Sequence, residues 1–212
     1  MRQVLKRSGV THLLTAQPQQ EAYLLTRPEG KFVQAHLRQI HRKTATVLYE
    51  FSDKPLTQET TCYDFLDHIR DATIRVDGKP VNKPNTDFRR VIGSDSDVRY
   101  SLLGFPNEEV EYSLTLCERP VLQFAVGQAI QECSGKGLFE IWLSHDTGTH
   151  RLLYSRELYA EKKPHDSGWF EERLNLGDFA GKRVRIRFKT SHLEGEPCNG
   201  YCWADPVILS AP

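Results

Sequence analysis

The second half of the chain consists of short segments with the composition of β-strands, separated by turn residues. These segments cover residues 109–117, 120–130, 137–145, 149–156, 169–176, 182–191 and 201–209. Seven strands of this length and spacing, with no helical period between them, are typical of an antiparallel β-sandwich. We therefore expect residues 109–212 to fold as a sandwich, and this expectation constrains the chain more than any other feature.

Two of these segments alternate clearly between apolar and polar side chains. One of them alternates Val184, Ile186 and Phe188 with Arg183, Arg185, Arg187 and Lys189. The other alternates Phe139, Ile141 and Leu143 with Glu140, Trp142 and Ser144. Because successive side chains of a strand point to opposite faces of a sheet, each strand is expected to have one core face. The opposite face is then basic in one strand and carries an aromatic residue in the other.

The first half of the chain has other patterns, and we divide it into two regions. Residues 1–52 are expected to form a small α/β unit, with short helices at 4–9 and 19–25 and strands at 10–15, 32–41 and 44–51. Residues 53–108 contain many turn residues and are expected to be an irregular connecting region with one helix, over 61–72, and a short strand at 74–76. The fold class predicted for the chain is mainly β.

Composition excludes some functions and leaves the compartment open. The 28 Lys and Arg residues balance the 28 Asp and Glu residues, so net charge gives no argument for nucleic-acid binding. No run of eighteen apolar residues predicts a membrane span. Residues 1–7 lack the apolar stretch of a secretory signal, which leaves a cytosolic protein or a chain whose signal or membrane segment precedes Met1.

The five cysteines do not have the spacing of a zinc site. In an oxidising compartment, Cys117 and Cys133 are one candidate disulfide, and Cys198 and Cys202 are another. Free thiols are the alternative for all of them.

Recognised enzyme motifs are missing from the sequence. The nucleophile elbow, the P-loop, the dinucleotide fingerprint and the H-E-x-x-H zinc motif do not occur. Ser144, His145 and Asp146 have the residue types of a catalytic triad, but three consecutive strand residues do not converge as a triad requires. We therefore expect a protein that binds rather than one that catalyses.

Residues 121–209 resemble the jelly-roll sandwiches of the galactose-binding-like and carbohydrate-binding-module group. The similarity lies in the segments 139–143, 174–189 and 201–209. It implies an antiparallel jelly-roll β-sandwich after the α/β unit, and a glycan or a protein surface as the partner. Because such sandwiches have several functions, the resemblance indicates the fold better than it indicates the ligand.

The first fifty residues weakly resemble the soluble C-terminal region of polytopic membrane glycosyltransferases. The similarity lies in the segments 9–14 and 45–51. The chain lacks the membrane helices and the acidic loop of those enzymes, so the resemblance implies an accessory extracytoplasmic part associated with a membrane protein, and not the catalytic part.

The candidate binding residues fall into two groups. Trp142 and Glu140, with Arg185 and Arg187 if the strands share a sheet, would make a platform on which a sugar ring stacks and anionic groups bind. Trp169 and Trp203 are candidates for a pocket at the loop end of the sandwich. The alternative is that the tryptophans are buried and the arginines are solvated.

Asp205 is the main candidate metal ligand, for a structural calcium ion. Asp146 and Glu132 are possible further ligands, since one acid alone does not make a calcium site. The alternative role for Asp205 is to cap a turn before Pro206.

These observations lead to two functional hypotheses. The first is a non-catalytic extracytoplasmic module that binds glycan or a partner surface through its sandwich. The second is a structural subunit of a larger, membrane-associated assembly without a sugar ligand. An enzyme acting on sugars is a third, weaker alternative.

Overall fold

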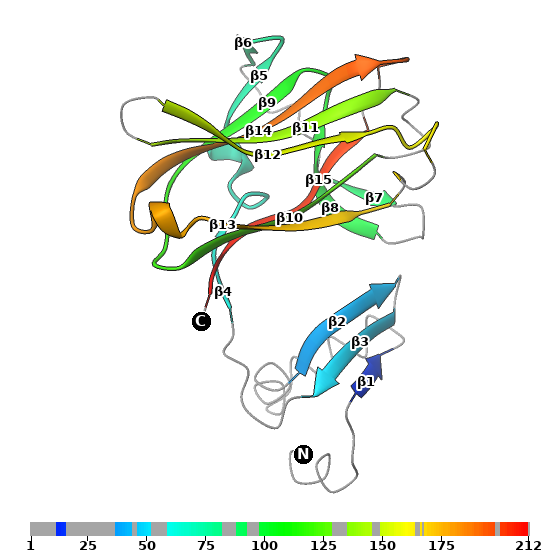
Figure 1. Ribbon diagram of the computed structural model, residues 1–212, viewed down its shortest axis with the longest axis vertical. Coiled ribbons are helices and arrows are strands. Elements are labelled where there is room, and N and C mark those ends of the chain that lie inside the picture. Colours follow the sequence, from blue (N-terminus) through cyan, green and yellow to red (C-terminus); the bar gives the residue numbers. More distant parts are fainter. Residues whose placement is uncertain are drawn as a thin grey trace, which may run out of the picture. The chain divides into compact units, whose positions relative to one another are not determined.

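The computed structural model describes residues 12–15, 37–43, 46–51, 59–81, 88–92, 98–128, 135–145, 149–163, 166, 168–197 and 200–211 (Figure 1). The chain divides into two compact units, the first within residues 1–59 and the second made of residues 60–94 and 98–211. In the described ranges, no helix has both the length and the apolar character needed to span a bilayer.

The first unit contains a three-stranded antiparallel sheet. Its strands are β1 (His12–Thr15), β3 (Thr46–Phe51) and β2 (Leu37–Lys43), in that order. They confirm strands within the ranges expected at 10–15 and 44–51. The strand expected at 32–41 is described from residue 37 and continues to Lys43, through the residues expected to join it to the next strand. The helices expected at 4–9 and 19–25 lie outside the described residues.

The second unit is a β-sandwich of two six-stranded antiparallel sheets (Figure 1). The β10 sheet consists of β13 (Phe170–Asn175), β10 (Pro120–Gln128), β15 (Tyr201–Ser210), β8 (Val98–Gly104) and β7 (Phe88–Ile92), with β4 (Thr60–Asp64) also paired to β15. The β14 sheet consists of β12 (Thr149–Leu158), β11 (Lys136–His145), β14 (Arg183–Glu194), β9 (Glu108–Thr115), β5 (Thr73–Val76) and β6 (Lys79–Pro80). The jelly-roll sandwich expected from the sequence is confirmed.

The core lies between the two sheets and follows the alternation read from the sequence. The β14 sheet contributes Phe139, Ile141, Leu143, Val184, Ile186 and Phe188, all at most 1% exposed. The β10 sheet contributes Leu122, Phe124 and Val126, at most 2% exposed. Each such side chain contributes about 1.5–3 kcal/mol by leaving water. The arginines of β14 therefore point away from the core, as the pattern predicts.

The sandwich begins at Thr60, much earlier than expected. Strands β4, β5, β6, β7 and β8 belong to its sheets, so the described part of 53–108 is largely sandwich and only in part a connecting region. The short strand expected at 74–76 is confirmed by β5, which ends at a turn where Asp77 and Gly78 both have positive φ.

The helix expected over 61–72 is wrong. Residues 60–64 form strand β4, and a 3-10 turn, η1 (Ile69–Asp71), follows after a turn. The Asp64 carboxylate ends the strand by accepting the Leu66 N–H at 2.8 Å, which is a local alternative to helical hydrogen bonds. Phe65 and Ile69 still enter the core, at 0% and 4% exposure, so the apolar spacing was real but belonged to a strand and a turn.

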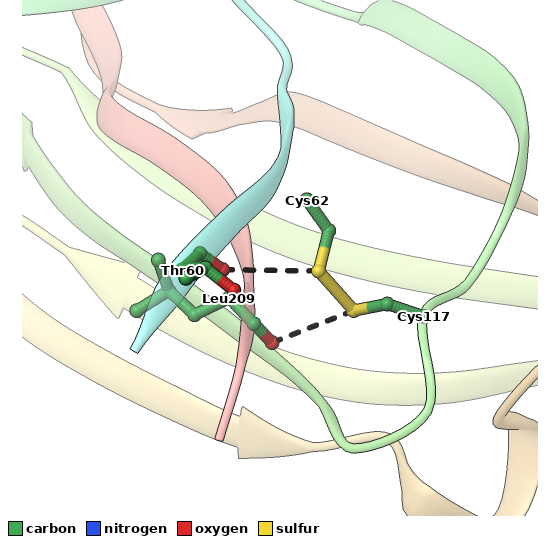
Figure 2. Close-up of a disulfide and its surroundings, with 4 residues drawn as sticks. All are labelled: Thr60, Cys62, Cys117 and Leu209. Atoms are coloured by element: carbon green, nitrogen blue, oxygen red, sulfur yellow. Dashed lines mark hydrogen bonds between the residues drawn. A yellow bond between two sulfur atoms is a disulfide. The ribbon is translucent and has the colours of Figure 1, made fainter. Parts of the chain in front are cut away.

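A disulfide between Cys62 and Cys117 connects the two sheets (Figure 2). Cys62 lies in β4, and Cys117 lies two residues beyond β9, with 6.4 Å between the Cα atoms. Closing a loop with a sequence separation of 55 residues stabilises the fold by about 4 kcal/mol in the chain-entropy model. The link fixes the edge strand β4 to the end of the opposite sheet.

This disulfide corrects one of the pairings proposed from the sequence. Cys117 pairs with Cys62 and therefore not with Cys133. The sequence does not reveal the pairing of Cys62 with Cys117, because the helix expected over 61–72 would place Cys62 outside the sandwich. Cys133 and Cys198 lie outside the described residues, and Cys202 is buried with its sulfur 3.1 Å from the Gly200 carbonyl oxygen.

Candidate functional site

The outer face of the β14 sheet brings together four of the residues singled out from the sequence. Strand register arranges the central side chains of this face in three cross-strand rows, which we name after one member each. The Trp142 row is Leu152, Trp142, Arg187 and Glu111; the Lys189 row is Ser155, Glu140, Lys189 and Glu109; the Arg185 row is His150, Ser144, Arg185 and Ser113. Trp142, Arg185 and Arg187 therefore lie in one sheet, which the sequence left as a condition of the site.

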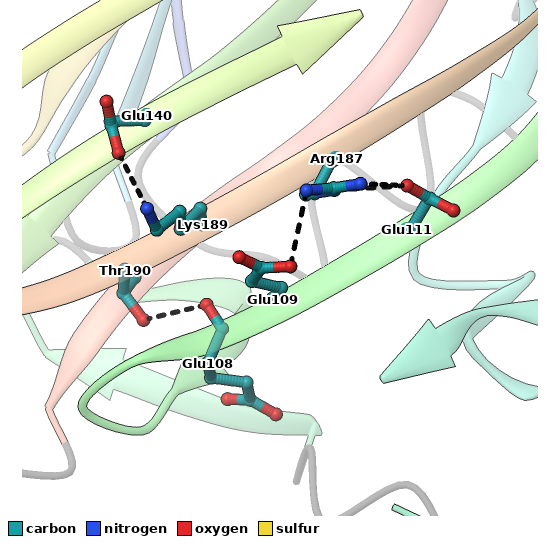
Figure 3. A network of polar contacts seen from close by, with 7 residues as sticks. All are labelled: Glu108, Glu109, Glu111, Glu140, Arg187, Lys189 and Thr190. Carbon is teal, nitrogen blue, oxygen red and sulfur yellow. Dashed lines mark hydrogen bonds and ion pairs between the residues drawn. The ribbon is translucent and has the colours of Figure 1, made fainter. Parts of the chain in front are cut away.

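Most charges on this face neutralise one another (Figure 3). The Arg187 guanidinium donates to Glu111 Oε2 from Nε at 3.0 Å and from Nη2 at 2.8 Å, and its Nη1 lies 3.4 Å from Glu109 Oε2. Lys189 Nζ lies 3.4 Å from Glu140 Oε2. Arg187 and Glu140 are thus internal partners of neighbouring side chains, and Arg187 has little capacity left for an anionic ligand.

Trp142 lies at the middle of this face. It is half-buried, and in its row it stands between Arg187 and Leu152, whose side chain is 43% exposed. The Trp142 ring and the exposed Leu152 side chain therefore form an apolar patch. Polar side chains of the Lys189 row and the Arg185 row lie on either side of it.

Arg185 differs from the other two cations of the three central rows on β14. Its Nε lies 3.2 Å from Ser144 Oγ, and the side chain is exposed. Across the ranges that the structure describes, it has no carboxylate partner. Ser144 itself is 3% exposed, and its hydroxyl oxygen accepts this hydrogen bond from Arg185 Nε.

Trp169 lies on the opposite side of the sandwich, on the β10 sheet. The Arg99 guanidinium carbon lies 5.6 Å from the centre of the Trp169 ring, and Arg99 Nη2 donates to Glu171 Oε1 at 2.7 Å. A Cβ on Gly127 would lie 2.8 Å from the Trp169 ring, so this ring rests against the β10 backbone. Trp169 and Trp142 therefore do not share a site.

Trp203 is a core residue and not a ligand platform. It is 2% exposed, and its ring centre lies 5.2 Å from that of Phe188 and 5.3 Å from that of Phe139. Its position on β15 alternates with Cys202 and Ala204, which placed it on the inner face. No ring surface remains on which a sugar could stack.

Asp205 marks a change of partner along strand β15. Before it, Ala204 pairs with β8, and after it, Val207 pairs with β4, while the register with β10 also shifts. Asp205 is exposed and has a φ of 46°, a left-handed conformation that Asp tolerates better than most residues. This left-handed conformation at the change of partner strand accounts for the presence of an aspartate before Pro206.

The metal expectation for Asp205 has no cluster to support it in the described part of the chain. Within those ranges, no group of three or more His, Cys, Asp or Glu side chains is arranged to hold a metal ion. Asp146 and Glu132, the other candidates, lie outside the described residues.

Glu108 is a buried carboxyl group that the sequence reading missed. It is 1% exposed, and its Oε2 accepts the Phe105 N–H at 2.7 Å, while its Oε1 has no hydrogen-bond partner in the described structure. Burial raises the pKa of Glu108 to about 7, against the lowering effect of the Phe105 hydrogen bond. Alternation with Val110 and Tyr112, both in the core, was the signal that could have placed it inward.

No family model and no curated protein matches this chain. Solved structures similar to it include the K3 cleaved adhesin domain of Lys-gingipain from Porphyromonas gingivalis W83, at 16% identity and a TM-score of 0.44, covering 73% of this chain and 100% of that one.

Two carbohydrate-binding modules are also among these structures. TmCBM61 in complex with β-1,4-galactotriose shares 14% identity at a TM-score of 0.37, covering 70% of this chain and 94% of that one. CBM51 from Clostridium perfringens GH95 in complex with methyl-galactose shares 12% identity at a TM-score of 0.39, covering 72% of this chain and 92% of that one. These are the kinds of module that the sequence resembles, and at such identities the likeness concerns the fold alone.

Proposed function

We propose that the sandwich is a non-catalytic, extracytoplasmic binding module that holds a glycan on the outer face of the β14 sheet, centred on Trp142. The observation that carries the proposal is the setting of Trp142: a half-buried indole on a sheet face whose neighbouring charges are mostly paired with each other. Such a surface presents a flat apolar patch with hydrogen-bonding groups on both sides.

This arrangement matches the chemistry of a sugar ring. The C–H face of a pyranose packs on an indole, while its hydroxyl groups need donors and acceptors at the edge of the ring. Glu140 and Glu111 keep unused acceptor lone pairs after binding Lys189 and Arg187. Because the ion pairs hold these carboxylates in place, little side-chain freedom is lost when a sugar binds.

The disulfide supports the extracytoplasmic part of the proposal. Disulfides persist mainly in oxidising compartments, and Cys62 is exposed, so a reducing cytosol would have access to the bond. Residues 1–52 would then be an accessory region of a membrane-associated system, in line with their weak resemblance to the soluble part of membrane glycosyltransferases.

A protein partner is the second candidate for the same face. Leu152, 43% exposed, extends the apolar patch beside Trp142, and charged rows surround both. An apolar centre with a polar rim is the usual composition of a protein interface. In this case the domain would be a structural or interaction subunit.

Glycan binding is tested on an array of oligosaccharides with the wild-type protein, Trp142→Ala, and Trp169→Ala as the matched tryptophan control on the other sheet. We expect binding that Trp142→Ala abolishes and Trp169→Ala leaves intact. No binding to any glycan, together with copurification of one stable partner protein that Trp142→Ala releases, would favour the second candidate.

A structural calcium ion near Asp205 is a separate proposal. It rests on the exposed carboxylate at a fixed backbone kink. Scanning calorimetry of the full chain with calcium and with a chelator tests it: a higher melting temperature with calcium that Asp205→Asn abolishes supports the site, and equal melting temperatures exclude it.

A further inference from the structure

The three rows on the outer face of the β14 sheet differ in charge balance. The Trp142 row places Arg187 beside Glu111, and the Lys189 row places Lys189 between Glu140 and Glu109. The Arg185 row contains His150, Ser144, Arg185 and Ser113, and no carboxylate. Positive charge is therefore uncompensated at one end of the proposed glycan surface and compensated in the rest of these rows.

Part of the Arg185 guanidinium makes no hydrogen bond within the described structure and can therefore bind an anion. Its Nε is 3.2 Å from Ser144 Oγ, which leaves the N–H groups of Nη1 and Nη2 without a partner in the described structure. Those two nitrogens point parallel N–H bonds away from the end of the side chain, which matches the two oxygens of a carboxylate. The hydrogen bond to Ser144, which is 3% exposed, orients the Arg185 guanidinium.

The position of Arg185 relative to Trp142 sets the geometry of a ligand that would reach both. Trp142 and Ser144 are two residues apart on β11 and share a face, and Arg185 is the register partner of Ser144. Arg185 is thus a diagonal neighbour of Trp142, at a typical spacing of about 7–8 Å. A hexuronic acid has its carboxylate on C5, at the edge of the ring, and could therefore stack on Trp142 and extend this group to Arg185.

We infer that Arg185 is an anion subsite beside Trp142 and that the module binds a glycan containing uronic acid through this carboxylate. The inference rests on the proposed function and specifies its ligand class. Arg187 and Lys189 do not provide the same subsite, because Glu111, Glu109 and Glu140 already satisfy them. The carboxylate is bound only by hydrogen bonds and charge, and no covalent bond changes.

The experiment is isothermal titration calorimetry with trigalacturonate, its methyl ester and neutral galactotriose. The proteins are wild type, Arg185→Gln, Arg185→Lys, Trp142→Ala, and Arg173→Gln as the control that removes an exposed arginine from the other sheet. Because Arg185 is exposed, its substitution leaves the core untouched, and melting curves verify this.

We expect wild type to bind trigalacturonate at least about tenfold more tightly than the methyl ester, since a charge-assisted bidentate pair is lost. Arg185→Gln should lower the affinity for the acid by about the same factor and leave that for the ester unchanged. Arg185→Lys should restore it only in part, because lysine lacks the fork. Arg173→Gln should behave as wild type.

Other results overturn the inference in recognisable ways. Equal affinity for acid and ester, or an Arg185→Gln variant that binds the acid normally, rejects the subsite; if Trp142→Ala still abolishes binding, the proposed function survives. Binding of neutral galactotriose that is as tight as the binding of trigalacturonate rejects the role of the carboxylate. If none of the saccharides binds, both the inference and the proposed function are rejected.

Discussion

The outer faces of the two sheets use the same residue types in different ways. In the three central rows of the β14 sheet, the ion pairs join neighbouring strands, as with Arg187 of β14 and Glu111 of β9. On the β10 sheet, Arg99 of β8 meets Glu171 of β13, and strands β15 and β10 lie between them. The cross-strand row that ends at Glu171 is made of small residues, Ser101, Ala204 and Ala125, all at most 1% exposed.

This difference is the reason why we propose the outer face of the β14 sheet as the contact surface. Small side chains on the β10 sheet let Arg99 lie across the strands and bind Trp169 and Glu171, so its side chain is only 18% exposed. On the β14 sheet the pairs are local, and Trp142 and the end of Arg185 stay accessible. A tryptophan with arginine and glutamate nearby is therefore not enough to indicate a binding site.

The two faces and the core each contain one tryptophan, and their removal should have unequal effects. Trp203→Ala should lower the free energy of unfolding by about 3–5 kcal/mol, because it leaves a cavity among Phe124, Phe139 and Phe188. Trp142→Ala should cost less than about 1 kcal/mol. Urea unfolding measures both, and equal costs would show that Trp142 is a structural residue.

The contrast between inner and outer faces also occurs within strand β9, at Glu108 and Glu109. Burial raises the pKa of Glu108 to about 7, so its protonated form favours the folded state. This stabilisation is complete below the ordinary glutamate pKa of 4.5 and is lost as the pH rises through about 7. The loss is on the order of 3 kcal/mol.

Urea unfolding over this pH range tests the role of Glu108. Glu108→Gln should remove most of the decline in stability between the two pKa values, and Glu109→Gln, on the outer face, should leave it in place. If the stability of the wild type instead rises with pH over this interval, the Glu108 carboxyl is not buried with an unpaired oxygen.

The close packing of Trp169 on the β10 sheet predicts a smaller effect. A Cβ at residue 127 would lie 2.8 Å from the Trp169 ring and 3.0 Å from the Gly168 carbonyl oxygen. Gly127→Ala should therefore cost about 1–3 kcal/mol of stability. In a Trp169→Ala background part of this cost should disappear, and a cost that is the same in both backgrounds would mean that the ring does not lie there.

A further prediction compares the ion pairs of the two faces. Glu111 is 9% exposed, so Glu111→Gln, which weakens two hydrogen bonds from Arg187, should cost about 1.5–3 kcal/mol. Glu171 is 70% exposed, and Glu171→Gln should cost less than about 1 kcal/mol. Thermal unfolding in low and high salt distinguishes the pairs, and the opposite ranking would reverse our comparison of the faces.

Much of the fold could be predicted from local alternation. The strands from residue 109 onward agree with the structure to within a few residues, because each has one face in the core. Region 53–108 could not be predicted in this way. Its strands pair with partners far along the chain, as β4 does with β15, and the apolar spacing around Phe65 suits a helix equally well.

The candidate site was predictable only in part. Alternation placed Trp142 and Arg185 on an outer face, but only the register showed that Arg187 meets Glu111 and that Arg185 meets Ser144. Trp203 was misjudged because its neighbours Cys202 and Ala204 are apolar as well, and the β15 segment therefore has no alternation to separate its faces. The positive φ of Asp205 depends on a change of partner strand that no local pattern reveals.

The central claim, that ligand binds at Trp142, is tested most directly by a nuclear magnetic resonance titration that follows the three indole N–H signals. Trp142, Trp169 and Trp203 report on the outer face of the β14 sheet, the outer face of the β10 sheet and the core, and single substitutions assign them. On addition of trigalacturonate, the Trp142 signal should shift with saturation while the other two stay unchanged. A saturable shift of Trp169 alone would contradict the account and place binding on the opposite sheet.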